Sequence, residues 1–165
     1  MKPTFLVSAC LVGANTRYDG ENSLDPDIIE LVQTGIAIPV CPEQLGGLET
    51  PRAPSEIVGG SGHEVLAGVC RVINKAGQDV TGNFIKGAEE TLKLAEAWQT
   101  VGAILKARSP SCGIAQIYDG TFQGKLTNGP GVTAALLMEA GFILLDENTL
   151  EEIQVQSRPS LGLCF

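Results

Sequence analysis

Histidine is almost missing from this sequence: its 165 residues include one, His63. Aromatic residues are also scarce at 5%, and charged residues at 18% fall below the roughly 25% usual in globular domains. A single imidazole excludes a His-rich metal site and leaves a Cys–His catalytic pair only one possible base. The five cysteines are therefore the first candidates for chemistry.

Long hydrophobic runs are missing too. No apolar stretch approaches the roughly 18 residues of a membrane span, and the run at residues 4–7 is too short for a signal peptide. We therefore expect a cytoplasmic protein with reduced thiols, in which spaced cysteines more often bind metal or act in catalysis than form disulfides. A disulfide framework is the alternative. The absence of any Cys-X-X-Cys pair disfavours a zinc ribbon or a thioredoxin-type dithiol.

Positive charge is in deficit, because 11 Lys and Arg residues against 19 Asp and Glu residues give a net charge of −8. That balance disfavours a long nucleic acid as partner, since such binding relies on neutralising phosphates. The apolar fraction of 44% suffices for one globular interior, and the length leaves no room for a second. We expect a single α/β catalytic domain over residues 1–150 and a C-terminal tail over residues 151–165.

Short apolar runs alternate with segments of helical periodicity along the chain. Strands are predicted at residues 4–9, 36–40, 65–73, 103–106 and 142–145. Helices are predicted at residues 24–34, at 83–100 and after Gly129-Pro130-Gly131, with a long loop at 42–62. This alternation predicts a three-layer α/β sandwich with a mostly parallel sheet, of the Rossmann or flavodoxin-like type.

Three cysteines, Cys10, Cys41 and Cys112, lie at or past the carboxyl ends of separate predicted strands. Because ligands bind outside the carboxyl ends of the strands in open α/β sheets, we expect these thiols to converge on one site. Cys70 lies within a predicted strand and Cys164 in the tail. We interpret those two as a small core residue and a tail thiol.

Three converging thiolates suit two kinds of cofactor. With a bound water as fourth ligand they can hold a catalytic zinc ion. They can also hold a [4Fe-4S] cluster and leave one iron open to bind substrate as a Lewis acid. Two other interpretations remain: an enzyme with one cysteine as nucleophile and His63 as its base, and a non-enzymatic metal- or cluster-binding module.

Charged residues near these cysteines suggest further roles. Glu43 follows Cys41 by two residues, where its carboxylate could activate water as a general base or simply be solvated on a loop. Four cations lie near a cysteine in the sequence: Arg17, Arg52, Lys106 and Arg108. They could lower thiol pKa values and offset the charge of a cluster, or merely balance nearby acids.

Two serines, Ser109 and Ser111, flank Pro110 immediately before Cys112. Their hydroxyl groups could orient a substrate, bond to the sulfur atoms of a cluster, or cap the turn. The residue types alone leave these alternatives open.

A series of short motifs follows in a fixed order: Ser8-Ala9-Cys10-Leu11-Val12-Gly13, Arg17-Tyr18-Asp19-Gly20, Pro39-Val40-Cys41-Pro42-Glu43, Thr50-Pro51-Arg52, Ser109-Pro110-Ser111-Cys112-Gly113, Ile117-Tyr118-Asp119-Gly120-Thr121-Phe122 and Gly129-Pro130-Gly131-Val132-Thr133. In content and order these motifs resemble the thiouracil desulfidase family. The resemblance extends over nearly the whole chain, from Leu6 to Glu147.

The resemblance implies a [4Fe-4S] cluster held by Cys10, Cys41 and Cys112, whose fourth iron captures the sulfur of a thiolated pyrimidine. It further implies that Glu43 and Ser109 take part in the chemistry. We therefore interpret the chain as a desulfidase that hydrolyses a C–S bond without redox change and releases hydrogen sulfide. Four residues are expected to bind substrate or support the site: Ser8, Arg17, Arg52 and Ser111. The size of the substrate (free base, nucleoside or nucleotide), the ring position of its sulfur and the oligomeric state stay open.

Overall fold

The computed structural model describes residues 4–149, so the predicted tail at 151–165 and Cys164 lie outside the described residues. A four-stranded sheet forms its centre, with strands in the order β2-β1-β5-β8 and every neighbouring pair parallel. The strands are β1 (Phe5–Ser8), β2 (Ala37–Val40), β5 (Gly102–Leu105) and β8 (Ile143–Asp146). The predicted α/β fold with a mostly parallel sheet is confirmed.

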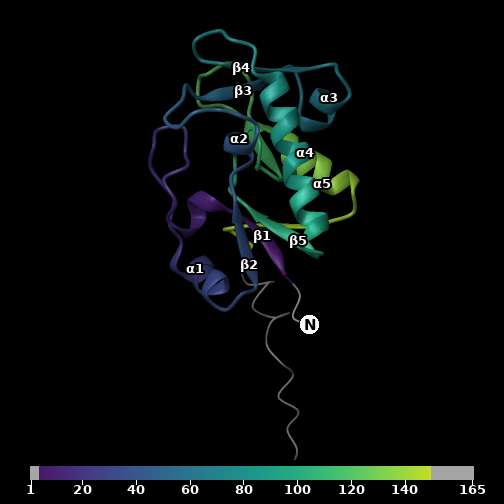
Figure 1. The fold of residues 1–165 in the computed structure, drawn as a ribbon. Helices are drawn as coiled ribbons and strands as arrows, with labels where there is room; N and C mark the ends of the chain where they lie inside the picture. The colour runs from purple at the N-terminus through teal and green to yellow at the C-terminus, as the bar shows by residue number, and fades with distance from the viewer. Residues whose placement is uncertain (1–3, 150–165) are drawn as a thin grey trace, which may run out of the picture.

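Helices cover both faces of this sheet (Figure 1). Helix α1 (Pro26–Gln33) packs on one face, and helices α4 (Thr81–Ala97) and α5 (Val132–Glu139) pack on the other. Along β1 the side chains alternate between the faces, as the strand period of two requires. Val7 lies in one buried cluster with Ile28 of α1, and Leu6 lies in another with Leu137 of α5. No helix among residues 4–149 is long and apolar enough to span a membrane.

The segment at 42–62, predicted as a loop, contains regular structure. It begins with the short helix α2 (Pro42–Leu45) and includes strand β3 (Ser55–Val58). Helix α2 lies directly against α4. The two backbones are so close that a methyl group on Gly87 would overlap the backbone carbonyl of Pro42. Only glycine permits that approach. The contact fixes the position of α2 over the sheet.

The strand predicted at 65–73 is wrong in its first half. Helix α3 (Gly62–Leu66) stands there, and strand β4 (Arg71–Asn74) follows and pairs antiparallel with β3. The amide and hydroxyl of Ser61 both donate hydrogen bonds to the Glu64 carboxylate, which stabilises the start of a helix. Val65 and Leu66 are therefore spaced as in a helix and do not alternate as in a strand.

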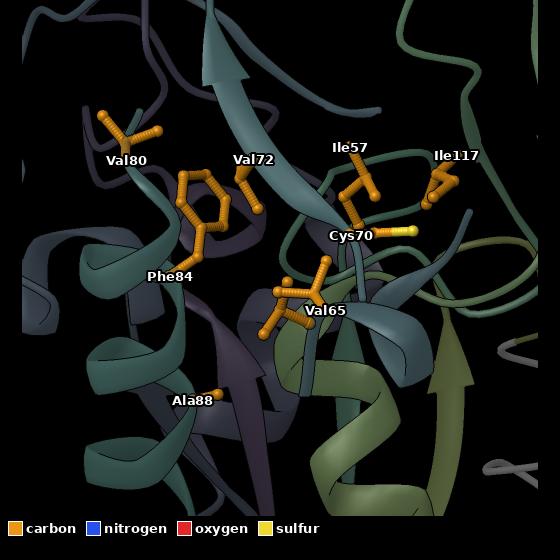
Figure 2. Close-up of a cluster of buried hydrophobic side chains, with 9 residues drawn as sticks. Ile57, Val65, Cys70, Val72, Val80, Phe84, Ala88 and Ile117 are labelled. Atoms are coloured by element: carbon orange, nitrogen blue, oxygen red, sulfur yellow. The ribbon is translucent and has the colours of Figure 1, made fainter. Parts of the chain in front are cut away.

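Cys70 is a core residue, as expected, although it precedes β4 and does not lie within a strand. Figure 2 shows its side chain among the apolar residues of a second buried cluster, near Ile57 and Ile117. The side chain is 8% exposed, and its surroundings are apolar. Its position in the structure agrees with a packing role.

Two short strands, β6 (Gln116–Tyr118) and β7 (Leu126–Asn128), form an antiparallel hairpin that the sequence does not predict. The hairpin contacts β3, and β3 and β4 lie beyond the carboxyl ends of the central strands (Figure 1). A single-turn 3-10 helix, η1 (Ala9–Val12), directly follows β1. These small elements complete the walls of the cavity described next.

Candidate active site

A cavity of about 540 Å³ lies at the carboxyl ends of β1, β2 and β5. Cys10 reaches it from η1, Cys41 from the start of α2, and Cys112 from the turn after β5. Each of these cysteines comes from a different strand end. The structure thus brings together the three thiols that were expected to converge.

Burial governs the protonation of two of these thiols. It raises the pKa of Cys10 to about 11, against the lowering effect of the Lys106 ammonium. It raises the pKa of Cys112 to about 12, against the lowering effect of a hydrogen bond from Ser8. An activated cysteine nucleophile needs the opposite shift, because the thiolate is the reactive form. These two positions are therefore unsuited to free-thiol nucleophilic catalysis.

His63 does not supply a base to the cavity. It lies in α3, where its Nδ1 atom is 2.9 Å from Oε1 of Glu139, and both side chains are exposed. Neither residue lines the cavity. Within residues 4–149 the predicted alternative of a Cys–His catalytic pair thus has no geometric support.

Glu43 lines the cavity and is held by an ion pair. The Nε atom of Arg52 donates a 2.7 Å hydrogen bond to Oε2 of Glu43, and the two side chains are only 10% and 16% exposed, respectively. Arg52 also donates to the carbonyl oxygen of Thr16, which lies 3.9 Å from the sulfur of Cys41. Glu43 is therefore an oriented carboxylate beside a candidate ligand and not a solvated loop residue.

Ser8 connects two strand ends beneath the cavity. Its hydroxyl oxygen accepts a 2.9 Å hydrogen bond from the backbone N–H of Lys106, and the same hydroxyl lowers the pKa of the Cys112 thiol. The side chain is 3% exposed. Ser8 thus ties the end of β1 to the end of β5.

Ser8→Ala is expected to lower the free energy of unfolding by about 1–3 kcal/mol, because the Lys106 N–H loses its partner in a partly buried place. Urea denaturation under anaerobic, reducing conditions measures this change. Ser55→Ala is a matched control, since Ser55 is half-buried in β3 and its hydroxyl makes no hydrogen bond within the part of the chain described. Equal losses in the two variants would contradict the assignment.

The two serines before Cys112 have different surroundings. The hydroxyl oxygen of Ser109, which lines the cavity, accepts hydrogen bonds from the N–H groups of Ser111 and Cys112 at 3.1 and 3.0 Å. The hydroxyl of Ser111 is buried and lies 2.8 Å from that of Thr133 in α5, away from the cavity wall. Ser109 caps the turn at the cavity surface, and Ser111 anchors the same turn to the helix layer.

The four cations near the cysteines, Arg17, Arg52, Lys106 and Arg108, all line the cavity. Like Arg52, the side chains of Arg17 and Lys106 are paired with acidic residues. Arg17 lies 3.0 Å from Asp19, and Lys106 lies 2.6 Å from Glu147, which also accepts hydrogen bonds from the Ala107 N–H. Five basic and two acidic side chains line the cavity of a protein that is acidic overall.

Among the cavity residues to which the sequence assigned no role are Glu56, Lys75, Tyr118 and Phe122. They come from β3, from the turn after β4, and from the β6–β7 hairpin. The signal in the sequence was the motif Ile117-Tyr118-Asp119-Gly120-Thr121-Phe122, whose Tyr118-Asp119-Gly120 run is typical of a turn after a strand. Neither composition nor periodicity indicated that this turn would face the cysteines.

The spacing of the candidate ligands bears on the kind of cofactor that they could hold. No group of three or more His, Cys, Asp or Glu side chains among residues 4–149 is close enough to hold a single metal ion. A [4Fe-4S] cluster places its cysteine ligands on separate corners of a cube, so the sulfur atoms stand farther apart than the ligands of one ion. The three thiols and the cavity that they share are compatible with a [4Fe-4S] cluster.

Comparisons with known proteins agree with this geometry. The family model described as 2-thiouracil desulfurase matches residues 5–149. The uncharacterized protein YbbK of Bacillus subtilis (strain 168) is 47% identical over 148 residues, which cover 90% of this chain and 98% of that protein. The solved structure of the [4Fe-4S]-dependent thiouracil desulfidase TudS is similar with a TM-score of 0.83 and 39% identity, covering 94% of this chain and 97% of that one. The chain therefore belongs to the 2-thiouracil desulfurase family.

Proposed function

We propose that this protein is a desulfidase that hydrolyses the C–S bond of a thiolated pyrimidine such as 2-thiouracil, with a [4Fe-4S] cluster held by Cys10, Cys41 and Cys112. The reaction consumes one water, replaces the thiocarbonyl sulfur by oxygen and releases one hydrogen sulfide, with no net transfer of electrons. The observation that carries the proposal is the convergence of these thiols and the oriented Glu43 carboxylate in one cavity. Family membership and the likeness to a [4Fe-4S]-dependent desulfidase support it.

Cys10, Cys41 and Cys112 would hold the cluster, which would supply one iron without a protein ligand as a Lewis acid for the thiocarbonyl group. The chain contributes to that cofactor a cavity lined by three thiols and by basic side chains. Arg17, Lys106 and Arg108 line the cavity and offset the negative charge of thiolates and sulfides. The Ser8 hydroxyl lowers the pKa of the Cys112 thiol and so favours the thiolate form that binds a cluster.

Glu43 is the proposed general base. Its carboxylate takes a proton from the attacking water and returns a proton to the departing sulfur, which keeps the hydrolysis balanced. Arg52 binds Oε2 and leaves the other carboxylate oxygen to accept the proton. The ion pair also fixes the orientation of the carboxylate, so that little reorganisation is needed when water is activated.

Ser109 is the proposed substrate-orienting residue. Its oxygen already accepts two backbone N–H groups, so its own proton is the part that remains for a ligand. That proton can be donated to a ring nitrogen, an oxygen or the leaving sulfur. Ser111 supports the site indirectly, because its bond to Thr133 holds the same turn. The proposed setting is the cytoplasm, where thiols and cluster stay reduced.

Anaerobic reconstitution with iron and sulfide tests this function. The expected result is a brown protein with four irons and four sulfides per chain that converts 2-thiouracil to uracil and sulfide in equal amounts. In ¹⁸O-labelled water, hydrolysis places the label in uracil. A panel of thiolated bases and nucleosides identifies the preferred substrate.

Two results would contradict the proposal. A protein that stays colourless after reconstitution, and releases no sulfide from any thiopyrimidine, would exclude the cluster. A protein that keeps its cluster but releases no sulfide would favour the alternative of a non-enzymatic cluster-binding module.

A further inference from the structure

Aromatic residues are scarce in this chain but gather in the cavity. Both tyrosines, Tyr18 and Tyr118, and one of the five phenylalanines, Phe122, line it. Phe122 lies in the turn between β6 and β7, away from the strand ends that carry the cysteines. It is half-buried and belongs to none of the three apolar clusters that form the core of the described residues. Core packing therefore does not account for its position.

The backbone of Phe122 has an unfavourable conformation, with φ at 57° in the left-handed region. Bulky side chains rarely occupy this region, and such strain persists only where the surrounding structure enforces it. Three non-glycine residues at 4–149 have a positive φ. One of them, Gln99, follows the C-cap of helix α4, whereas the other two, Arg108 and Phe122, line the cavity. Strain in this molecule thus concentrates at the candidate site.

A buried carboxylate enforces the conformation of Phe122. Oε1 of Glu56 accepts hydrogen bonds from the N–H groups of Gly120 at 3.0 Å and Phe122 at 3.2 Å, across more than sixty positions of sequence. Glu56 is 8% exposed, so it is committed to these bonds and not to water. Oδ1 of Asp119 accepts from the N–H and hydroxyl of Thr121 and tightens the same turn. The turn is therefore fixed to β3 in advance of any ligand.

We propose that Phe122 is a substrate-binding residue whose ring packs against the flat face of the thiopyrimidine, and that Glu56 is the positioning residue that presents it. The inference rests on the proposed function and specifies how that site selects a planar heterocycle. Aromatic rings bind pyrimidine faces through stacking, and the hydrophobic area they cover adds to the affinity. A ring fixed before binding loses little conformational entropy on contact, which explains why the fold tolerates a strained backbone here.

Phe122→Leu in the cluster-loaded protein tests the ring, because leucine keeps apolar volume but removes the flat face. The KM for 2-thiouracil and the Kd for the product uracil, from equilibrium dialysis, are expected to rise about 10-fold. The kcat and the visible spectrum of the cluster are expected to change little. Phe142→Leu is the matched control, since Phe142 is half-buried against the core cluster of α4 and α5. It should leave both constants unchanged.

Glu56 is tested through its coupling to Phe122. Glu56→Leu should raise KM as Phe122→Leu does. The KM of the double variant should be no higher than that of either single variant, because both substitutions abolish the same placement of the Phe122 ring. Glu56→Gln keeps an oxygen acceptor for the two N–H groups and should retain the wild-type KM. Simple loss of folding stability would give additive effects and no rescue by glutamine.

The outcomes separate the inference from the proposed function. Wild-type constants for both ligands in Phe122→Leu would overturn the inference and leave the desulfidase in place. A wild-type protein that releases no sulfide, yet binds uracil in a manner dependent on Phe122, would overturn the proposed function and support the assignment of the ring.

Discussion

Each of the substitutions Cys10→Ala, Cys41→Ala and Cys112→Ala is expected to remove bound iron and sulfide release together, which brings turnover to the level of cluster-free protein. The reason is the donor set: the three thiols reach one cavity from three strand ends, and alanine leaves two. Within residues 4–149 no other cysteine lines that cavity. Iron and sulfide analysis, the visible spectrum and sulfide release from 2-thiouracil measure the effect after anaerobic reconstitution.

Cys70→Ala is the matched control for these variants. Its thiol is buried among apolar side chains, so alanine should cost only about 1 kcal/mol of stability and leave iron content and turnover intact. The ligand assignment would be wrong if Cys70→Ala lost the cluster, or if any of the other three variants kept it.

The sheet topology explains why these thiols meet. Strand β2 lies on one side of β1 and β5 on the other, so the chain leaves the end of β1 toward one edge and later returns to the opposite side. Connections that diverge in this way open a crevice above the carboxyl ends of the two central strands. Cys10 follows β1 and Cys112 follows β5, so they flank this crevice, and Cys41 approaches from β2.

This part of the site was predictable from sequence because it depends on local patterns. Four-residue apolar strands are readable as runs, and a cysteine placed after such a run marks a strand end. Helix α3 was missed although Ser61 and Glu64 have the spacing of a helix start, because Val65 and Leu66 were read together with the apolar residues of β4. The prediction of a strand was wrong there because the strand period was applied to residues that begin with a helix-start signal.

The position of Phe122 in the cavity was not predictable for a different reason. Strands β6 and β7 have three residues each, too few to show a period. The contact that orients their turn joins Glu56 to Gly120, and no local propensity encodes a hydrogen bond over that separation. The ion pair of Glu43 with Arg52 is similar, since each residue was identified singly and their pairing appears only in three dimensions.

Glu43→Gln is expected to keep the cluster and lower kcat about 100- to 10,000-fold, with little change in KM. Glutamine matches glutamate in size and can still accept the Arg52 hydrogen bond through its amide oxygen, so the fold of α2 should be retained. What it loses is the capacity to take a proton from water. Sulfide release and the visible spectrum, measured on one anaerobic preparation, separate loss of chemistry from loss of cofactor. Turnover within a few-fold of wild type would show that another group activates water.

Two further variants divide the roles within the ion pair. Glu49→Gln is the matched control, because Glu49 is exposed and lies outside the cavity wall, and it should leave kcat unchanged. Arg52→Lys keeps the positive charge but cannot reach Glu43 and the Thr16 carbonyl with separate N–H groups of a rigid fork. Its kcat should fall between those of wild type and Glu43→Gln, since the base remains but is poorly aimed. A loss as large as that of Glu43→Gln would mean that the guanidinium, and not carboxylate alignment, is the principal requirement for turnover.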